Sequence, residues 1–120
     1  MKKFDNFKLL TNTEKTIQYI TDVLVSFPRK EKVLKENMES SIYDMMECIF
    51  SYKINKSFKI KLKNLNDLLI KLSMLDFYTR VSFRKKLIND RKLEVISNYI
   101  LEIKKICYGV IEYENKNSVQ

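Results

Sequence analysis

No group of side chains in this sequence has the residue types and spacing of a catalytic centre. The chain contains no histidine, which excludes a Ser-His-Asp triad, a Cys-His pair and a histidine-ligated zinc site. Its one glycine, Gly109, excludes a glycine-rich phosphate loop. Four acids come nearest to a cluster, but their helical spacing spreads them over solvent-facing positions: Glu36, Glu39, Asp44 and Glu47. We therefore expect a protein that is not an enzyme and needs no metal or cofactor.

The cysteines and the apolar segments indicate the cellular compartment. Cys48 and Cys107 are too few for a disulfide framework, and their apolar helical spacing predicts buried, reduced thiols. Polar residues interrupt the first segment, so it does not resemble a signal peptide. No apolar run approaches the ~20 residues of a membrane span. We expect a cytoplasmic protein without a membrane partner or a small-molecule substrate.

The positive charge of the chain is concentrated in one segment. The sequence has 23 Lys and Arg against 15 Asp and Glu, a net charge of +8. Residues 56–92 contain 11 of the basic and three of the acidic residues, whereas the remainder carries 12 of each. This distribution predicts a polyanionic partner that approaches from one side. The alternative is an ordinary solvated surface rich in lysine.

Aromatic residues are interspersed among these cations. Basic residues with aromatics are typical of surfaces that contact phosphates and stack bases, although most aromatics of a helical bundle lie in its core. Arg84-Lys85-Lys86 is the strongest candidate for phosphate contact, but it could instead complement a helix dipole. The candidate nucleic-acid contacts in this segment are Lys56, Lys59, Lys63, Arg80, Arg84, Lys85, Lys86 and Arg91.

Helices must position these residues, because apolar residues recur at helical spacing throughout the chain. A capping box at Thr11-x-x-Glu14, Pro28 and a cap at Asn89-Asp90 mark helix ends. The pattern predicts one domain, 1–120, with helices at about 12–26, 30–53, 57–86 and 90–113. Short connections favour antiparallel neighbours, so we expect an all-α, up-down-up-down four-helix bundle.

The third helix is apolar on two sides. Leucines from Leu62 to Leu75 form its core stripe, while a second apolar set lies on the opposite side of its later half. A helix that is apolar all round needs burial on both faces. We therefore predict an oligomer interface, unless the first helix folds over this side to make a thick core. The predicted interface residues are Ile70, Met74, Phe77, Tyr78 and Val81.

Three stretches carry a resemblance to a known family. Residues 26–30 read Ser-Phe-Pro-Arg-Lys, residues 78–81 read Tyr-Thr-Arg-Val, and residues 102–111 begin Glu-Ile-Lys-Lys. In this pattern, which covers about residues 15–113, the chain resembles the accessory variability determinant (Avd) proteins of diversity-generating retroelements. Val110 stands where that family has Trp, and Lys104 and Tyr108 stand at two of its Gly positions.

The resemblance implies a specific function. Avd proteins form a pentameric, positively charged barrel that associates with the retroelement reverse transcriptase and its template RNA. They support error-prone cDNA synthesis and mutagenic retrohoming and have no catalytic activity. The resemblance adds Arg29, Lys30 and Arg80 as basic residues at family-like positions, either contacting nucleic acid or capping and pairing helices.

A sister group remains as the alternative. The four-helix-bundle proteins encoded in intervening sequences of 23S ribosomal RNA genes share the fold, and their Phe-Pro-x-x-Glu turn is matched at residues 27–31. Their Asn-Ile-Ala-Glu-Gly signature is absent. This alternative implies an interaction protein without a reverse transcriptase partner.

Overall fold

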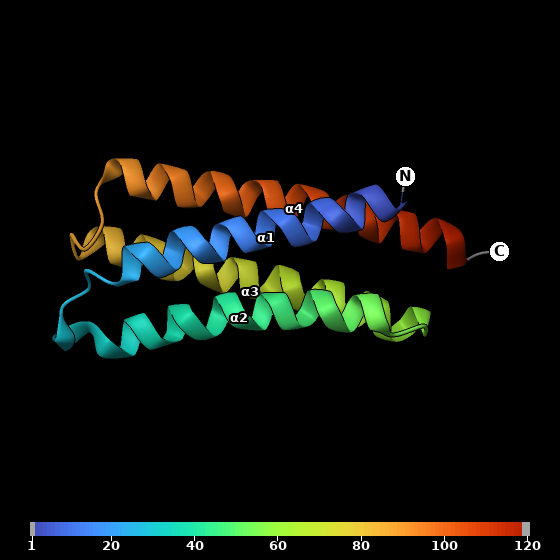
Figure 1. Ribbon diagram of the computed structural model, residues 1–120, viewed down its shortest axis with the longest axis horizontal. Helices are drawn as coiled ribbons and strands as arrows, with labels where there is room; N and C mark the ends of the chain where they lie inside the picture. Colours follow the sequence, from blue (N-terminus) through green and yellow to red (C-terminus); the bar gives the residue numbers. More distant parts are fainter. Residues whose placement is uncertain (1, 119–120) are drawn as a thin grey trace.

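Four helices run alternately up and down in the computed structural model (Figure 1), which describes the backbone of residues 2–118 and the side chains of 7–118. A short 3-10 turn, η1, precedes the second helix. The expected all-α, antiparallel four-helix bundle is therefore confirmed. The elements are α1 (Lys2–Leu24), η1 (Arg29–Glu31), α2 (Lys32–Ile54), α3 (Phe58–Arg84) and α4 (Asp90–Ser118).

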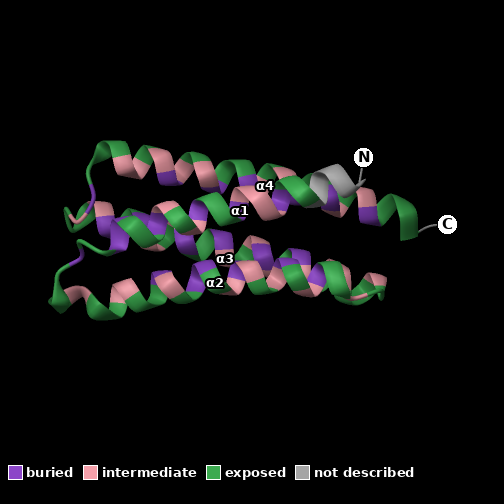
Figure 2. Ribbon diagram, viewed as in Figure 1, coloured by how far each residue is buried: buried purple, intermediate pink, exposed green. Residues whose placement is uncertain are grey.

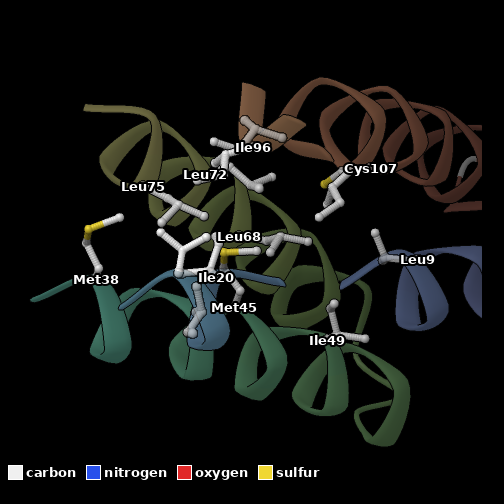
Figure 3. Close-up of a cluster of buried hydrophobic side chains, with 14 of the residues drawn as sticks. Leu9, Ile20, Met38, Met45, Ile49, Leu68, Leu72, Leu75, Ile96 and Cys107 are labelled. Atoms are coloured by element: carbon white, nitrogen blue, oxygen red, sulfur yellow. The ribbon is translucent and has the colours of Figure 1, made fainter. Parts of the chain in front are cut away.

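In cross-section the four helices lie at the corners of a square and follow one another around it in chain order. Each packs against the helices before and after it, and α4 closes the square against α1. Buried residues line the inner side of all four helices (Figure 2). Leu68, Leu72 and Leu75 of α3 lie in the middle of this core (Figure 3). Because α1 packs on α2 and α4, it does not fold over the outer side of α3, so the thick-core alternative is wrong.

Side chains cap the starts of two helices, α3 at Ser57 and α4 at Asn89, and the cap at Asn89 was expected. The Ser57 hydroxyl accepts a hydrogen bond from the Ile60 N–H at 3.5 Å. The Asn89 Oδ1 accepts one from the Lys92 N–H at 2.9 Å. Both satisfy backbone donors that have no partner within the first helical turn. Pro28 precedes η1 in an extended conformation, with φ −68°, which the proline ring favours.

The expected start of the first helix, residue 12, is wrong. Thr11 and Glu14 lie inside α1, which already includes Lys2, so they do not form a capping box. The reason is that Leu9, Thr13 and Thr16 are buried and extend the inward stripe toward the N-terminus. The Thr16 hydroxyl donates to the Asn12 carbonyl at 2.7 Å, a bond that satisfies a threonine inside a helix.

The expected ends of the last two helices also differ from the structure. α4 continues past residue 113 to Ser118, because Glu114 is buried and accepts a 2.6 Å hydrogen bond from the Tyr52 hydroxyl. α3 ends at Arg84 rather than 86, because Lys86 adopts a left-handed conformation with φ 64°. The other boundaries agree within one or two residues.

The two ends of the bundle differ in what they contain. The α1–α2 and α3–α4 connections lie at one end, which we call the loop end, and the chain termini lie at the other, the terminus end (Figure 1). The bundle measures 52 × 23 × 19 Å. Within residues 2–118, no helix has both the length and the apolar content needed to cross a membrane.

Candidate nucleic-acid interface

All ten basic residues predicted to contact nucleic acid are exposed, but they fall into two groups. Lys56, Lys59 and Lys63 lie at the terminus end, around the start of α3. The larger group lies at the loop end: Arg29, Lys30, Arg80, Arg84, Lys85, Lys86 and Arg91. α3 has 27 residues and is therefore about 40 Å long, and even the nearest members of the two groups, Lys63 and Arg80, lie about 25 Å apart along it. The single cationic surface expected from the sequence is therefore corrected to two.

An ion pair joins the two connections at the loop end. The Lys85 Nζ lies 3.2 Å from the Glu31 Oε1, which links the α3–α4 turn to η1. The Glu31 side chain is only 12% exposed, so the pair is partly shielded from solvent. Lys85 thus has a structural partner, whereas Arg29, Lys30, Arg84, Lys86 and Arg91 form no ion pair within the described side chains.

A tight turn brings the end of α3 close to the start of α4. The Leu87 N–H donates to the Ser82 carbonyl and the Lys86 N–H to the Phe83 carbonyl, both at 2.9 Å. This is the Schellman pattern, in which the residue at the position of Lys86 takes a left-handed conformation. The turn keeps Arg84, Lys86 and Arg91 within one short stretch of chain.

Two hollows adjoin at this turn and share Phe83 and Arg84. The first, which we call the turn hollow, has a volume of about 690 Å³; its lining includes Lys86, Asn89, Asp90 and Lys92. The second, the aromatic hollow, has a volume of about 430 Å³ and is lined by Phe77, Arg80, Phe83, Arg84 and Leu93. Lys92 was missed by the sequence interpretation as a site residue, although it is adjacent to Arg91.

The lysines of the terminus end have more intramolecular partners. The Lys63 Nζ lies 2.8 Å from the Asp67 Oδ2, and this hydrogen bond raises the pKa of Lys63. Lys61, in the same basic segment, donates to the Tyr52 carbonyl at 3.0 Å and lies 4.4 Å from the centre of the Tyr52 ring. Part of the charge excess therefore stabilises the bundle rather than facing a partner.

The acids and thiols do not form a chemical centre. Asp44, Glu47, Cys48 and Asp67 line a hollow between α2 and α3, but Asp44 is paired with Lys71 at 3.1 Å. Burial, followed by the charge of Asp67, raises the pKa of the half-buried Cys48. Burial raises the pKa of Cys107 to about 12. Both thiols stay protonated at neutral pH, and the described residues include no cluster suited to a metal ion.

The predicted apolar face of α3 is open to solvent along most of its length. Ile70 is 59% and Phe77 52% exposed, and Met74 is also exposed. Val81 is half-buried, and Tyr78 packs partly against the core. Ile70 lines the hollow between α3 and α2, whereas Phe77 lines the aromatic hollow beside α4.

A second apolar surface was missed by the sequence interpretation. It is a groove of about 760 Å³ between α1 and α2, and its apolar lining includes Ile17, Tyr43, Met46 and Phe50. Tyr43, Met46 and Phe50 are spaced three and four residues apart on α2, and they flank its buried stripe at about 100°. That spacing was a readable signal for a second apolar face.

Comparisons with known proteins agree with this architecture. In solved structures, the chain is similar to a protein of unknown function from the S23 ribosomal protein family of Bacteroides thetaiotaomicron, known from a crystal structure. The TM-score is 0.83 at 16% sequence identity, over 90% of this chain and 98% of that one, which is a likeness of fold. No curated protein matches the sequence.

The family assignment comes from the sequence itself. The model of the bAvd-like family matches residues 8–114, a range that contains all four helices almost completely. The resemblance drawn from residues 26–30, 78–81 and 102–111 is thereby confirmed. This chain belongs to the bAvd-like family.

Proposed function

We propose that this protein is a non-catalytic, basic, oligomeric accessory protein of a diversity-generating retroelement. It binds the reverse transcriptase and the template RNA or cDNA in the cytoplasm and supports mutagenic retrohoming. The observation that carries the proposal is the loop end, where seven exposed cations gather on a chain of the bAvd-like family. Such a group suits phosphate contact, because each neutralised phosphate releases counterions.

The two apolar surfaces support self-association into a ring. The outer face of α3 and the α1–α2 groove lie on different sides of the bundle. On α3 the contact is centred on Ile70 and Met74, and Phe77 lies at its edge, in the aromatic hollow beside α4. Contact between two different surfaces is head-to-tail, and head-to-tail contacts close into rings when the rotation permits. The family resemblance sets the expected number of subunits at five.

Charge complementarity favours the same pairing. Two acids, Glu14 and Asp22, line the α1–α2 groove beside one base, Lys15. The apolar face of α3 is flanked by Lys63 at one end and Arg84 at the other. An acidic groove opposite a basic-ended stripe would help to orient neighbouring subunits.

Light scattering tests the assembly. We expect the mass of an oligomer at micromolar concentration, and Ile70→Asp should reduce it to a monomer because the charge would be buried at the interface. Leu101→Asp is the matched control, since Leu101 is equally exposed, on α4, outside both surfaces. A stable wild-type monomer would contradict the oligomer.

Binding and activity assays test the partners. Fluorescence anisotropy with labelled template RNA should give an affinity that falls steeply with salt. Addition of the protein to purified reverse transcriptase should be required for cDNA synthesis from that template. RNA binding without an effect on the polymerase would support nucleic-acid binding but contradict the accessory role.

The likeness of fold to an S23-family structure is the observation behind one alternative function. In that alternative the protein is an interaction bundle of the 23S intervening-sequence type and has no polymerase partner. Genomic neighbourhood distinguishes the two functions. A reverse transcriptase gene with paired template and variable repeats beside this gene supports the retroelement function, and an intervening sequence within a 23S ribosomal RNA gene supports the alternative.

A further inference from the structure

The aromatic hollow combines an exposed ring with two guanidinium groups. Phe77 is 52% exposed, although a phenylalanine is normally buried for its apolar area. Arg80, Arg84 and Phe83 line the same hollow. Its volume of about 430 Å³ lies within the roughly 300–1,000 Å³ typical of small-molecule sites. An apolar ring beside fixed cations suits a ligand with a flat π-system and a negative charge.

Neighbouring side chains hold the ring and one cation in position. The Phe77 ring lies 5.9 Å from the Tyr78 ring, centre to centre, at an interplanar angle of 57°. Tyr78 itself packs against the core, so it restricts the Phe77 ring from one side. The Arg80 Nε donates a 3.0 Å hydrogen bond to the Asp76 Oδ2. Because this bond uses Nε, the terminal nitrogens of Arg80 can donate to a ligand.

Arg84 connects the aromatic hollow to further positive charge. It also lines the turn hollow, together with Lys86 and Lys92. A strand that passes from one hollow to the other would therefore meet cations on consecutive phosphates. A planar guanidinium can bind a phosphate through two hydrogen bonds and can also stack on a base.

We propose that the aromatic hollow binds one unpaired nucleotide of a single-stranded nucleic acid. The base stacks on the exposed face of Phe77, and the adjoining phosphates contact Arg84 and then the cations of the turn hollow. A base in a duplex cannot offer its face to a side chain, so the site selects unpaired segments. This inference rests on the proposed nucleic-acid binding and deepens it by naming the strand type and the stacking residue.

A tryptophan reporter tests the stacking directly. The chain contains no tryptophan, so Phe77→Trp introduces a single tryptophan, which can be excited without its tyrosines and whose emission is quenched when a base stacks on it. We expect quenching by oligo(U), and little quenching by an abasic strand of equal length or by a duplex. Leu101→Trp is the matched control, because Leu101 is similarly exposed, on α4, and lies outside the aromatic hollow and both apolar surfaces.

The outcomes distinguish failure of the nucleotide site from failure of the proposed function. If anisotropy shows that the wild-type protein binds no strand, the proposed function fails and the site fails with it. If the protein binds oligo(U) but the reporter at position 77 is not quenched, only the site is wrong. Equal quenching of the reporters at positions 77 and 101, or equal quenching by the abasic strand, also overturns the stacking proposal.

A second pair of variants separates stacking from subunit contact. Phe77→Leu keeps an apolar side chain but removes the aromatic face, so we expect about tenfold weaker binding of oligo(U) and an unchanged assembly mass. Phe77→Tyr keeps the ring and should restore the wild-type affinity. If Phe77→Leu lowers the assembly mass and leaves the affinity unchanged, Phe77 is a subunit contact and the nucleotide site is wrong.

Discussion

The two ends of the bundle have charge of the same sign but different chemistry. All four arginines of the chain lie at the loop end, and three of them have no ion pair within the described side chains. The basic side chains at the start of α3 are all lysines, and Lys61 and Lys63 are engaged within the molecule. Arginine offers a planar donor pair that matches a phosphate, whereas lysine acts as a hydrated point charge. Net charge alone therefore does not locate a binding surface.

Charge reversal at each end gives the largest expected effect. Arg84→Glu with Lys86→Glu should weaken RNA binding by at least about 100-fold, because two charge-assisted contacts of about 1.5–3 kcal/mol each are lost. Lys56→Glu with Lys59→Glu makes the same change in charge at the terminus end and should weaken RNA binding by less than about fivefold. Anisotropy at one fixed salt concentration measures both. Equal losses would remove the distinction between the ends.

The next effect concerns stability at the terminus end. Tyr52→Phe removes the 2.6 Å hydrogen bond to the buried Glu114 while keeping the ring beneath Lys61. We expect the free energy of unfolding to fall by about 2 kcal/mol, as is typical of a hydrogen bond to a carboxylate, with RNA affinity unchanged. Urea unfolding followed by circular dichroism measures this.

The loop-end ion pair supplies the control for that experiment. Lys85→Ala removes the Lys85–Glu31 pair, whose lysine is half-exposed, and should cost less than about 1 kcal/mol. If Lys85→Ala destabilises the protein more than Tyr52→Phe does, the loop end is the part that holds the bundle together, contrary to our interpretation.

Alkaline pH should weaken the bundle through Cys107. Burial raises the pKa of this thiol from 9.0 to about 12 in the folded chain. In the unfolded chain the thiol ionises near pH 9, so stability that is present below pH 9 is lost as the pH rises toward 12. At pH 10 the loss is about 1.4 kcal/mol. Urea unfolding at pH 8 and pH 10 should show a smaller decrease in Cys107→Val, in which the other titrating groups are unchanged.

A further small effect comes from the loop-end turn. Lys86 has φ 64°, a conformation that costs a side chain about 1 kcal/mol and costs glycine nothing. Lys86→Gly should therefore raise the free energy of unfolding by about 1 kcal/mol, while RNA binding weakens because one cation is lost. Lys86→Ala keeps the strain and removes the same charge. If both variants have equal stability, the turn is not strained.

The fold was predictable because the bundle depends on local signals. The apolar periodicity of α2, α3 and α4 and the caps at Ser57 and Asn89 are fixed by residues a few positions apart. The early start of α1 and the late end of α4 were not predictable in the same way. Leu9, Thr13 and Glu114 are held by contacts with other helices, and neither threonine nor glutamate signals burial by its type.

The candidate site was predictable only as a set of residues. Exposure of Arg84, Lys86 and Phe77 follows from helical periodicity, but their grouping depends on how the helices are arranged. Because α3 runs the whole length of the bundle, the lysines at its start and Arg84 at its end lie about 40 Å apart. Arg29 and Lys30, distant in sequence, instead join Lys85 at the loop end through the Glu31 contact. Nothing in the sequence pattern indicated that pairing.

The antiparallel topology has a practical consequence for handling this protein. The first residues of α1 and the last turn of α4 leave the bundle on the same side, opposite the arginines (Figure 1). An affinity tag, a surface tether or a fluorescent fusion joined to either end would therefore be separated from the arginine-bearing turns by most of the 52 Å length of the bundle. Immobilised in this way, the molecule would present those turns to ligands in the surrounding solution.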